Sequence, residues 1–112
     1  MASAEDELDR LIAELGKLED VIPGGELLWL ERMEALEGEA TTALHLAENT
    51  GQFEKGLELA LLMAHYWWVQ GRNSEGRSWL WTFLGASGGV RLQQAEQVRD
   101  WLYKLAGEDD PA

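Results

Sequence analysis

Tryptophan is the residue type in this chain best suited to contacts with a partner. Five of its six tryptophans lie in the second half of the sequence: Trp67, Trp68, Trp79, Trp81 and Trp101. Indole rings are enriched at binding hot spots, where truncating one commonly costs about 2 kcal/mol or more. Large rings also fill the wide gaps between packed helices, and this second use is the commoner one. The five residues are therefore candidates for an interface or for a core that packs helices together.

The spacing of these tryptophans restricts how many rings can be buried. Neighbouring residues diverge by about 100° around a helix, so Trp67 and Trp68 cannot both face one groove. Trp79 and Trp81, two positions apart, also point away from each other. At least one ring of each pair should therefore be partly exposed or meet another surface.

Two arginines, Arg72 and Arg77, stand beside these tryptophans in the sequence. A guanidinium can anchor a carboxylate or a phosphate through paired hydrogen bonds. The same side chain can instead stack on an indole face or pair with a nearby acid such as Glu75. On the first interpretation, the two arginines would border a ligand pocket in the region of Trp67 and Trp79.

Residues for other kinds of chemistry are scarce. The chain has no cysteine, which excludes disulfides, thiol catalysis and zinc sites built on cysteine. Its two histidines, His45 and His65, lack further ligands at a suitable spacing, so no metal site is expected. The serines lie in expected turns, and no nucleophile stands with a base and an orienting group. We therefore expect a protein without catalytic activity, metal or cofactor.

The charge of the chain narrows the choice of partners. The chain carries 21 acidic residues against nine basic ones, for a net charge of -12. This surplus opposes binding to a phosphate backbone and to an anionic membrane surface. The first residues are acidic, unlike a signal peptide, and no apolar run approaches the roughly 20 residues of a membrane helix. We expect a cytoplasmic protein that contacts neither nucleic acid nor membrane directly.

Most of the negative charge lies in the first third of the chain. Residues 1–39 hold twelve acids and three bases, whereas every aromatic residue except Trp29 lies at or after Phe53. The acidic stretch is most simply a solvated cap. Alternatively, the acids of residues 5–20 imitate phosphates and dock on a basic, DNA-binding partner, which would make the protein an inhibitory decoy.

Hydrophobic periodicity predicts helices throughout the chain. Apolar residues recur at helical spacing over residues 4–20, and Ser3 with Asp6 forms a potential capping box at the start. Further helical patterns cover residues 26–49, 52–70, 74–85 and 91–106. No segment alternates with a period of two residues, so strands are not expected and the predicted fold class is all-α.

The helix predicted at 52–70 is apolar on nearly every side. A helix of this kind must be covered on more than one face, which places it at the centre of the domain. The turn sequences Pro23-Gly24-Gly25 and Ser87-Gly88-Gly89 set off the first and last helices. Residues 107–112 form an acidic tail that we expect to be frayed.

A glycine pattern occurs twice between the apolar helices. The motif G-x-x-x-x-G is repeated at an interval of 20 residues, with Gly51 and Gly56 in the first copy and Gly71 and Gly76 in the second. The first glycine of each pair allows the left-handed turn that ends one helix, and the second allows the next helix to pass close to its neighbour. His45 and His65 occupy equivalent positions in the two copies, so they should lie on neighbouring helices. Such repetition is typical of helical-repeat proteins.

Several of these segments together resemble part of a known protein family. They resemble the tetratricopeptide-like region of large bacterial regulators of the LuxR and AfsR type. In that region W-L-x-R-L-E is followed by L-x-L-A and then by R-G-x-x-x-E-G-R-x-W-L. The matching segments here are Trp29-Leu30-Glu31-Arg32-Met33-Glu34, Leu57-Glu58-Leu59-Ala60 and residues 66–80. The resemblance covers about residues 26–106, and residues 66–80 are its most specific part.

The resemblance implies a superhelical domain that follows a nucleotide-binding ATPase module and mediates protein or effector contacts beside a DNA-binding domain. Residues 37–44 depart from the H-D-N-L-R-A-A-L stretch that the family usually has there. The sequence also has no G-x-x-x-x-G-K-[ST] phosphate loop and no basic helix-turn-helix, so ATPase and DNA-binding activities do not carry over. The chain is expected to be one segment of such a regulator or a free-standing relative of that segment.

Together these observations predict an all-α fold of about five helices in antiparallel hairpins, wound as a right-handed, tetratricopeptide-like superhelix. The predicted parts are an acidic capping helix with its turn (1–25), the repeat domain (26–106) and the tail (107–112). Because about three repeats are usually needed to bury a core, the helix at 91–106 should leave apolar surface for a second copy or a larger regulator.

The favoured function is a non-catalytic scaffold for protein–protein contacts in bacterial signalling or transcriptional regulation, acting with a protein partner or as a homodimer. An effector-sensing domain that binds a small molecule in a tryptophan-lined groove is the second hypothesis. The acidic decoy is the third.

Overall fold

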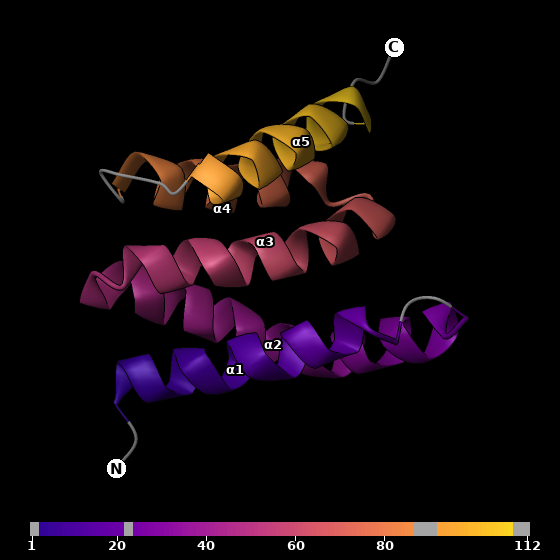
Figure 1. Ribbon diagram of the computed structural model, residues 1–112, viewed down its shortest axis with the longest axis horizontal. Helices are drawn as coiled ribbons and strands as arrows, with labels where there is room; N and C mark the ends of the chain where they lie inside the picture. Colours follow the sequence, from indigo (N-terminus) through magenta and orange to yellow (C-terminus); the bar gives the residue numbers. More distant parts are fainter. Residues whose placement is uncertain (1–2, 22–23, 87–91, 109–112) are drawn as a thin grey trace.

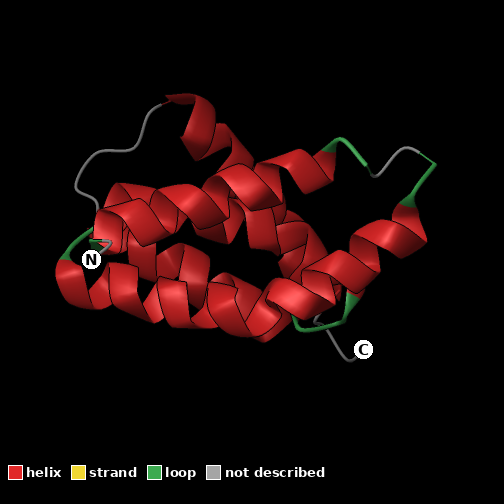
Figure 2. Ribbon diagram, turned by 90° about the horizontal axis from the view of Figure 1, so that it is seen from below, coloured by secondary structure: helices red, strands yellow, loops and turns green. Residues whose placement is uncertain are grey.

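Local sequence signals set the limits of five helices in the computed structural model. They are α1 (Ala4–Glu19), α2 (Glu26–Thr50), α3 (Phe53–Val69), α4 (Asn73–Ala86) and α5 (Leu92–Glu108). The structure describes residues 3–21, 24–86 and 92–108, and within these ranges it has helices and loops but no strand (Figure 2). The predicted all-α class is confirmed, and each helix begins and ends within two residues of its expected limits.

The first helix begins with the capping box that the sequence predicts. The Ser3 hydroxyl accepts a hydrogen bond from the backbone N–H of Asp6 at 3.1 Å, and the Asp6 carboxylate accepts one from the backbone N–H of Ser3 at 3.4 Å. These bonds satisfy backbone donors at the helix start. At the other end of the chain, α5 continues to Glu108, past its expected end. The predicted turn at 87–89 and the rest of the predicted frayed tail, 109–112, lie outside the described residues.

The helix α3 lies at the centre of the molecule and contacts the other four helices. In Figure 1 it runs between α1 and α2 on one side and α4 and α5 on the other. Leu57, Ala60 and Met63 on this helix are at most 1% exposed. The central position predicted from the apolar surface of this helix is thus confirmed.

The helices α1, α3 and α5 run in the same direction. Ion pairs join Glu5 and Asp9, early in α1, to Lys55 at the start of α3. A ring contact joins His65, late in α3, to Trp101 in the second half of α5. The direction matters because three parallel helices present three parallel rows of side chains on one side of the molecule.

The first helix shares the core of the rest of the chain. Leu8, Leu11 and Leu15 of α1 are at most 1% exposed and belong to the same apolar cluster as the buried residues of α2 and α3. Burying one such side chain contributes roughly 1.5–3 kcal/mol. The acidic helix is therefore an integral layer of the fold, with its charges on the outside.

The two glycine turns have the same backbone structure. Gly51 and Gly71 have φ values of 75° and 72°, in the left-handed region that favours glycine. In both turns the N–H of the following residue donates to the carbonyl oxygen five residues before it, at 2.9 Å in the first turn and 2.8 Å in the second. This pattern satisfies carbonyl groups at the helix end. The predicted role of these two glycines is confirmed.

The second glycine of each pair allows a large side chain to approach closely. A Cβ at Gly56 would collide with the ring of Phe83 in α4, and one at Gly76 would lie 3.1 Å from Leu105 and 3.2 Å from Trp67. The close approach predicted here is present. The group that occupies the space is a side chain of another helix rather than its backbone.

Across the described residues, no helix combines the length and the apolar character needed to span a membrane.

Candidate binding groove

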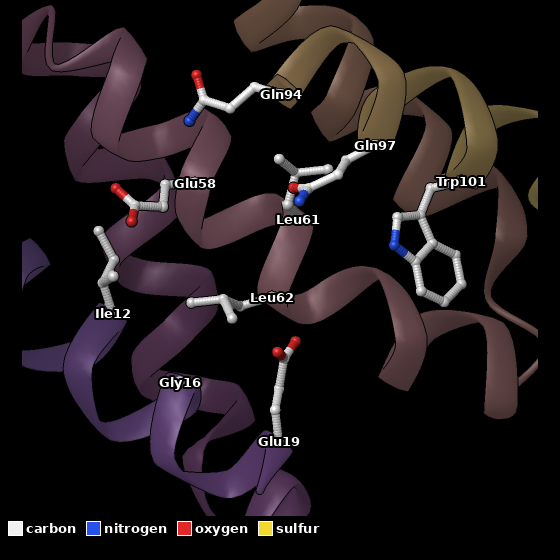
Figure 3. Close-up of a pocket in the computed structure, with 9 residues that line it drawn as sticks. All are labelled: Ile12, Gly16, Glu19, Glu58, Leu61, Leu62, Gln94, Gln97 and Trp101. Atoms are coloured by element: carbon white, nitrogen blue, oxygen red, sulfur yellow. The ribbon is translucent and has the colours of Figure 1, made fainter. Parts of the chain in front are cut away.

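A hollow of about 670 Å³ lies along α3, between α1 and α5. Each of the three helices contributes three lining residues, spaced three or four residues apart except for the adjacent Leu61 and Leu62. They are Ile12, Gly16 and Glu19 of α1, Glu58, Leu61 and Leu62 of α3, and Gln94, Gln97 and Trp101 of α5. We call this hollow the groove (Figure 3).

The groove exists because two helices flank one face of the central helix. Both α1 and α5 pack against α3, and the hollow lies between them. Leu61 and Leu62 form its floor and are only half-buried, although they belong to the most apolar helix of the chain. At Gly16, between Ile12 and Glu19, the α1 wall has no side chain, and a Cβ added there would meet nothing within 4 Å. Apolar surface on the central helix thus remains accessible between two walls that carry both polar and apolar side chains.

The two charged residues among the described lining of the groove are both acidic. Glu19 and Glu58 carry the carboxylates, Gln94 and Gln97 carry amides, and no lysine or arginine is among the described residues that line the hollow. Figure 3 shows the two carboxylates entering the groove from α1 and α3. Partial burial, followed by the charge of neighbouring Asp20, raises the pKa of Glu19. The groove is therefore suited to hydrogen-bond donors and cations.

An aromatic cluster stands at the Trp101 end of the groove. The His65 ring lies 4.7 Å from Trp29, 5.8 Å from Trp101 and 6.1 Å from Trp68, measured between ring centroids. The ammonium of Lys104 lies 4.7 Å from the centre of the Trp101 ring. Burial, together with the charge of Lys104, lowers the pKa of His65. The imidazole therefore favours its neutral form among these rings.

The predicted tryptophans have different environments. Trp67 is fully buried, with its ring against Gly76, so it is a core residue and is removed from the candidate interface. Trp68 is half-buried and lies 6.4 Å from Trp101, the one member of the predicted set that lines the groove. The burial of Trp67 follows from its position on the face of α3 that meets α4.

The second pair of tryptophans lies on α4. Trp79 packs against His45 at 4.8 Å and Phe83 at 5.6 Å, between ring centroids. Trp81 is 59% exposed. One ring of each pair therefore meets solvent, as the helical spacing predicts. The pocket expected around Trp67 and Trp79 has no contribution from Trp67, because that ring has no accessible surface.

Both predicted arginine anchors bind groups of the chain itself. Arg72 donates to Glu75 from Nε at 3.0 Å and from Nη2 at 2.6 Å, and its Nη1 pairs with Glu37 of α2. Arg77 donates to the backbone carbonyl of Leu105 at 3.2 Å. These contacts favour the structural interpretation, in which Arg72 ties the turn before α4 to α2.

The acids on the outside of α1 are partly neutralised by cations of the chain. Lys55 of α3 pairs with Glu5 and Asp9, and Arg10 pairs with two acids of its own helix and with Glu39 of α2. These pairs are exposed and contribute little to stability. They do reduce the charge that α1 offers to a basic partner.

The two histidines lie on neighbouring helices, α2 and α3, as the repeat predicts. Each packs against a tryptophan two helices further along the chain, His45 against Trp79 and His65 against Trp101. Within the described part of the chain, no three histidine, aspartate or glutamate side chains are grouped to hold a metal ion.

The apolar end expected on the last helix is not confirmed. The exposed side chains described on α5 are those of Glu96, Gln97, Arg99, Asp100, Tyr103, Lys104 and Ala106. Tyr103, at 82% exposed, is the one large apolar side chain among them. This polar face has no apolar stripe on which a further helix would pack.

Sequence reasoning identified Trp101 as a site residue but missed the other eight residues that line the groove. A glycine in the last turn of an amphipathic helix, Gly16, was the clearest available signal, because a glycine within a helix costs up to about 1 kcal/mol relative to alanine. Gln94 and Gln97 carried no signal, because their role depends on the neighbouring helices.

No protein-family model matches the chain, and neither a curated protein nor a solved structure is significantly similar to it. Function must therefore be inferred from the geometry.

Proposed function

We propose that this protein is a non-catalytic scaffold that binds a partner protein in the groove, in bacterial signalling or transcriptional regulation. The biological setting rests on the resemblance of residues 26–106 to the helical region of LuxR- and AfsR-type regulators. The proposed architecture is a short tetratricopeptide-like right-handed superhelix, in which α1, α3 and α5 form the inner layer. Two observations support this architecture: the three helices run in the same direction, and α3 contacts both α1 and α5.

The observation that carries the proposal is the accessible apolar floor of the groove. Leu61 and Leu62 are only half-buried, although they lie on the central helix. Around them the groove presents two carboxylates, two amides and the Trp101 ring. Core packing would cover such leucines, whereas binding sites combine apolar area with a few polar groups that fix orientation. The other sequence-predicted anchors, Arg72 and Arg77, contact groups within the chain.

Photo-crosslinking from inside the groove tests this function. Benzoylphenylalanine replaces Gly16 in one variant and Gly38 in another, because a Cβ at either position meets nothing within 4 Å. Gly38 lies on α2, away from the groove. After irradiation in cells that express the protein, we expect mass spectrometry to identify a protein joined to position 16 and absent from position 38. Equal crosslinking from both positions, or none from position 16, would contradict the proposal.

A small-molecule effector is the second candidate, because the volume of the groove, about 670 Å³, lies within the range of known ligand sites, roughly 300–1,000 Å³. Trp101 would report such binding, since it lines the hollow. A metabolite that changes the tryptophan fluorescence of the wild type but not of Trp101→Phe would favour this candidate. An unchanged spectrum across a metabolite library would count against it.

A further inference from the structure

We infer that the occupant of the groove is a short cationic, amphipathic segment of a partner protein, with a lysine or arginine beside Glu19 or Glu58 and apolar side chains on Leu61, Leu62 and Trp101. This inference rests on the proposed function and specifies the partner that it requires.

The charge of the site determines the sign of the partner. Among the described lining residues, two carry carboxylates, two carry amides and none is a cation, in a chain whose net charge is -12. The ammonium of Lys104 stands over the Trp101 ring at one end of the groove. Opposite charge across an interface accelerates association and excludes partners of the wrong sign. Two other occupants would be acidic. A second copy of this chain has a net charge of -12, and the segment Glu108-Asp109-Asp110 of the chain itself has three adjacent acids. Neither fits the groove as well as a basic segment of another protein.

The apolar floor requires more than charge from the partner. Leu61, Leu62 and Ile12 offer aliphatic surface, and Trp101 adds an aromatic ring at one end. A free inorganic cation or a purely polar basic tail would leave this surface in contact with water. A segment with a basic residue and one or two large apolar residues uses both features of the site.

The width of the groove depends on Gly16. This residue lies in the last turn of α1, and its missing side chain faces the hollow. A glycine within a helix costs up to about 1 kcal/mol relative to alanine. No packing contact in the core requires it, since a Cβ there has open space. Its effect on the site is to leave room for a side chain of the partner beside Glu19.

A peptide selection tests the inference. Displayed random 12-residue peptides are selected on the wild-type protein alone and are then titrated against Gly16→Trp, which places an indole ring in the groove. Gly38→Trp carries the same change outside the groove and is the matched control. We expect the enriched peptides to combine lysine or arginine with large apolar residues. Their affinity should fall at least tenfold on Gly16→Trp and stay within twofold of wild type on Gly38→Trp.

A charge-matched pair of variants tests the role of the carboxylates. Glu19→Gln with Glu58→Gln should weaken the selected peptides roughly 3- to 10-fold at low salt, in line with partly exposed charge pairs. Glu31→Gln with Glu48→Gln removes the same charge from exposed positions on α2, outside the groove, and should change affinity less than twofold. Equal losses in both double variants would show attraction to net charge alone and would overturn the inference.

The two proposals fail in different ways. Peptides that lose affinity on Gly16→Trp but carry no basic residue would overturn the cationic partner and leave the groove as a protein-binding site. Peptides that bind Gly16→Trp as tightly as wild type would contradict both proposals. Crosslinking from position 16 tests independently whether a protein binds in the groove in cells.

Discussion

At the scale of single residues, glycines determine how closely the helices pack. The ring of Phe83 occupies the space beside Gly56, while the equivalent Gly76 receives Trp67 and Leu105. Gly16, in contrast, faces open space. Glycine therefore allows close packing at Gly56 and Gly76, whereas at Gly16 it leaves a hollow open.

Substituting alanine at these positions should separate the two uses. Gly56→Ala places a methyl group against the Phe83 ring, so we expect a loss of roughly 1–3 kcal/mol in the free energy of unfolding. Gly16→Ala meets no atom and should stabilise the protein by up to about 1 kcal/mol. Urea unfolding followed by circular dichroism measures both. A Gly56→Ala variant as stable as the wild type would show that the Phe83 contact does not limit packing.

The environment of His65 should make stability depend on pH. Burial, followed by the charge of Lys104, lowers the pKa of His65 in the folded state. As the pH falls below about 6.5, the unfolded chain binds a proton first, so the free energy of unfolding falls until the folded pKa is reached. His65→Phe should remove this part of the pH dependence. A titration midpoint of the His65 ring at or above 6.5, measured by NMR, would contradict the assignment.

The sequence predicts the role of a residue well where that role depends on local backbone conformation, and poorly where it depends on contacts with other helices. The turns at Gly51 and Gly71 follow from local backbone conformation and were predictable. The partner of Gly56 was not, because Phe83 approaches from another helix. Trp67 was misjudged for the same reason, since the number of apolar neighbours around a ring depends on tertiary packing.

At the scale of elements, Arg72 joins three helices at one turn. It follows α3, pairs with Glu75 in the first turn of α4, and pairs with Glu37 in the middle of α2. Glu37 also accepts a hydrogen bond from Tyr66 of α3, whose pKa is raised by burial and by this carboxylate. The cluster fixes where α4 starts relative to α2.

Removing this cation should loosen the junction. Arg72→Ala leaves two partly buried carboxylates without their partner, and we expect a loss of about 1 kcal/mol after allowance for solvent screening. Arg99→Ala removes an exposed arginine paired at 3.6 Å and should change stability by less than about 0.5 kcal/mol. Thermal unfolding compares the two. Equal melting temperatures for both variants would show that the Arg72 cluster has no structural role.

The helices themselves were predictable because their apolar periodicity and glycine turns are local signals. The groove was not, because a groove depends on which faces remain between neighbouring helices. Gln94 and Gln97 illustrate this limit. Their side chains are ordinary for a helix surface, and they become lining residues only because α5 lies along α3 beside α1.

At the scale of the whole molecule, the distribution of charge separates its surfaces. The outer acids of α1 pair with Lys55 and Arg10, whereas the described residues beside Glu19 and Glu58 in the groove include no lysine or arginine. The negative charge that opposes binding to nucleic acid and to anionic membranes is also present in the groove, at Glu19 and Glu58. It favours a basic partner in the groove over contact through the outer face of α1.

The exposed surface of the last helix should disfavour self-association. Tyr103 is the one large apolar side chain on the described outer face of α5, and two copies would each bring a net charge of -12. We expect the isolated chain to sediment as a monomer of 12.6 kDa at low salt. A dimer that persists at micromolar concentration, and that Tyr103→Ala disrupts, would instead support the homodimer hypothesis.

The groove as a protein-binding site is tested most directly by the affinity of the crosslinked partner for two matched variants. Isothermal titration calorimetry compares wild type, Gly16→Trp and Gly38→Trp. We expect Gly16→Trp to weaken the partner at least tenfold, with unchanged helicity, and Gly38→Trp to bind like the wild type. Wild-type affinity for Gly16→Trp would contradict the assignment of the groove.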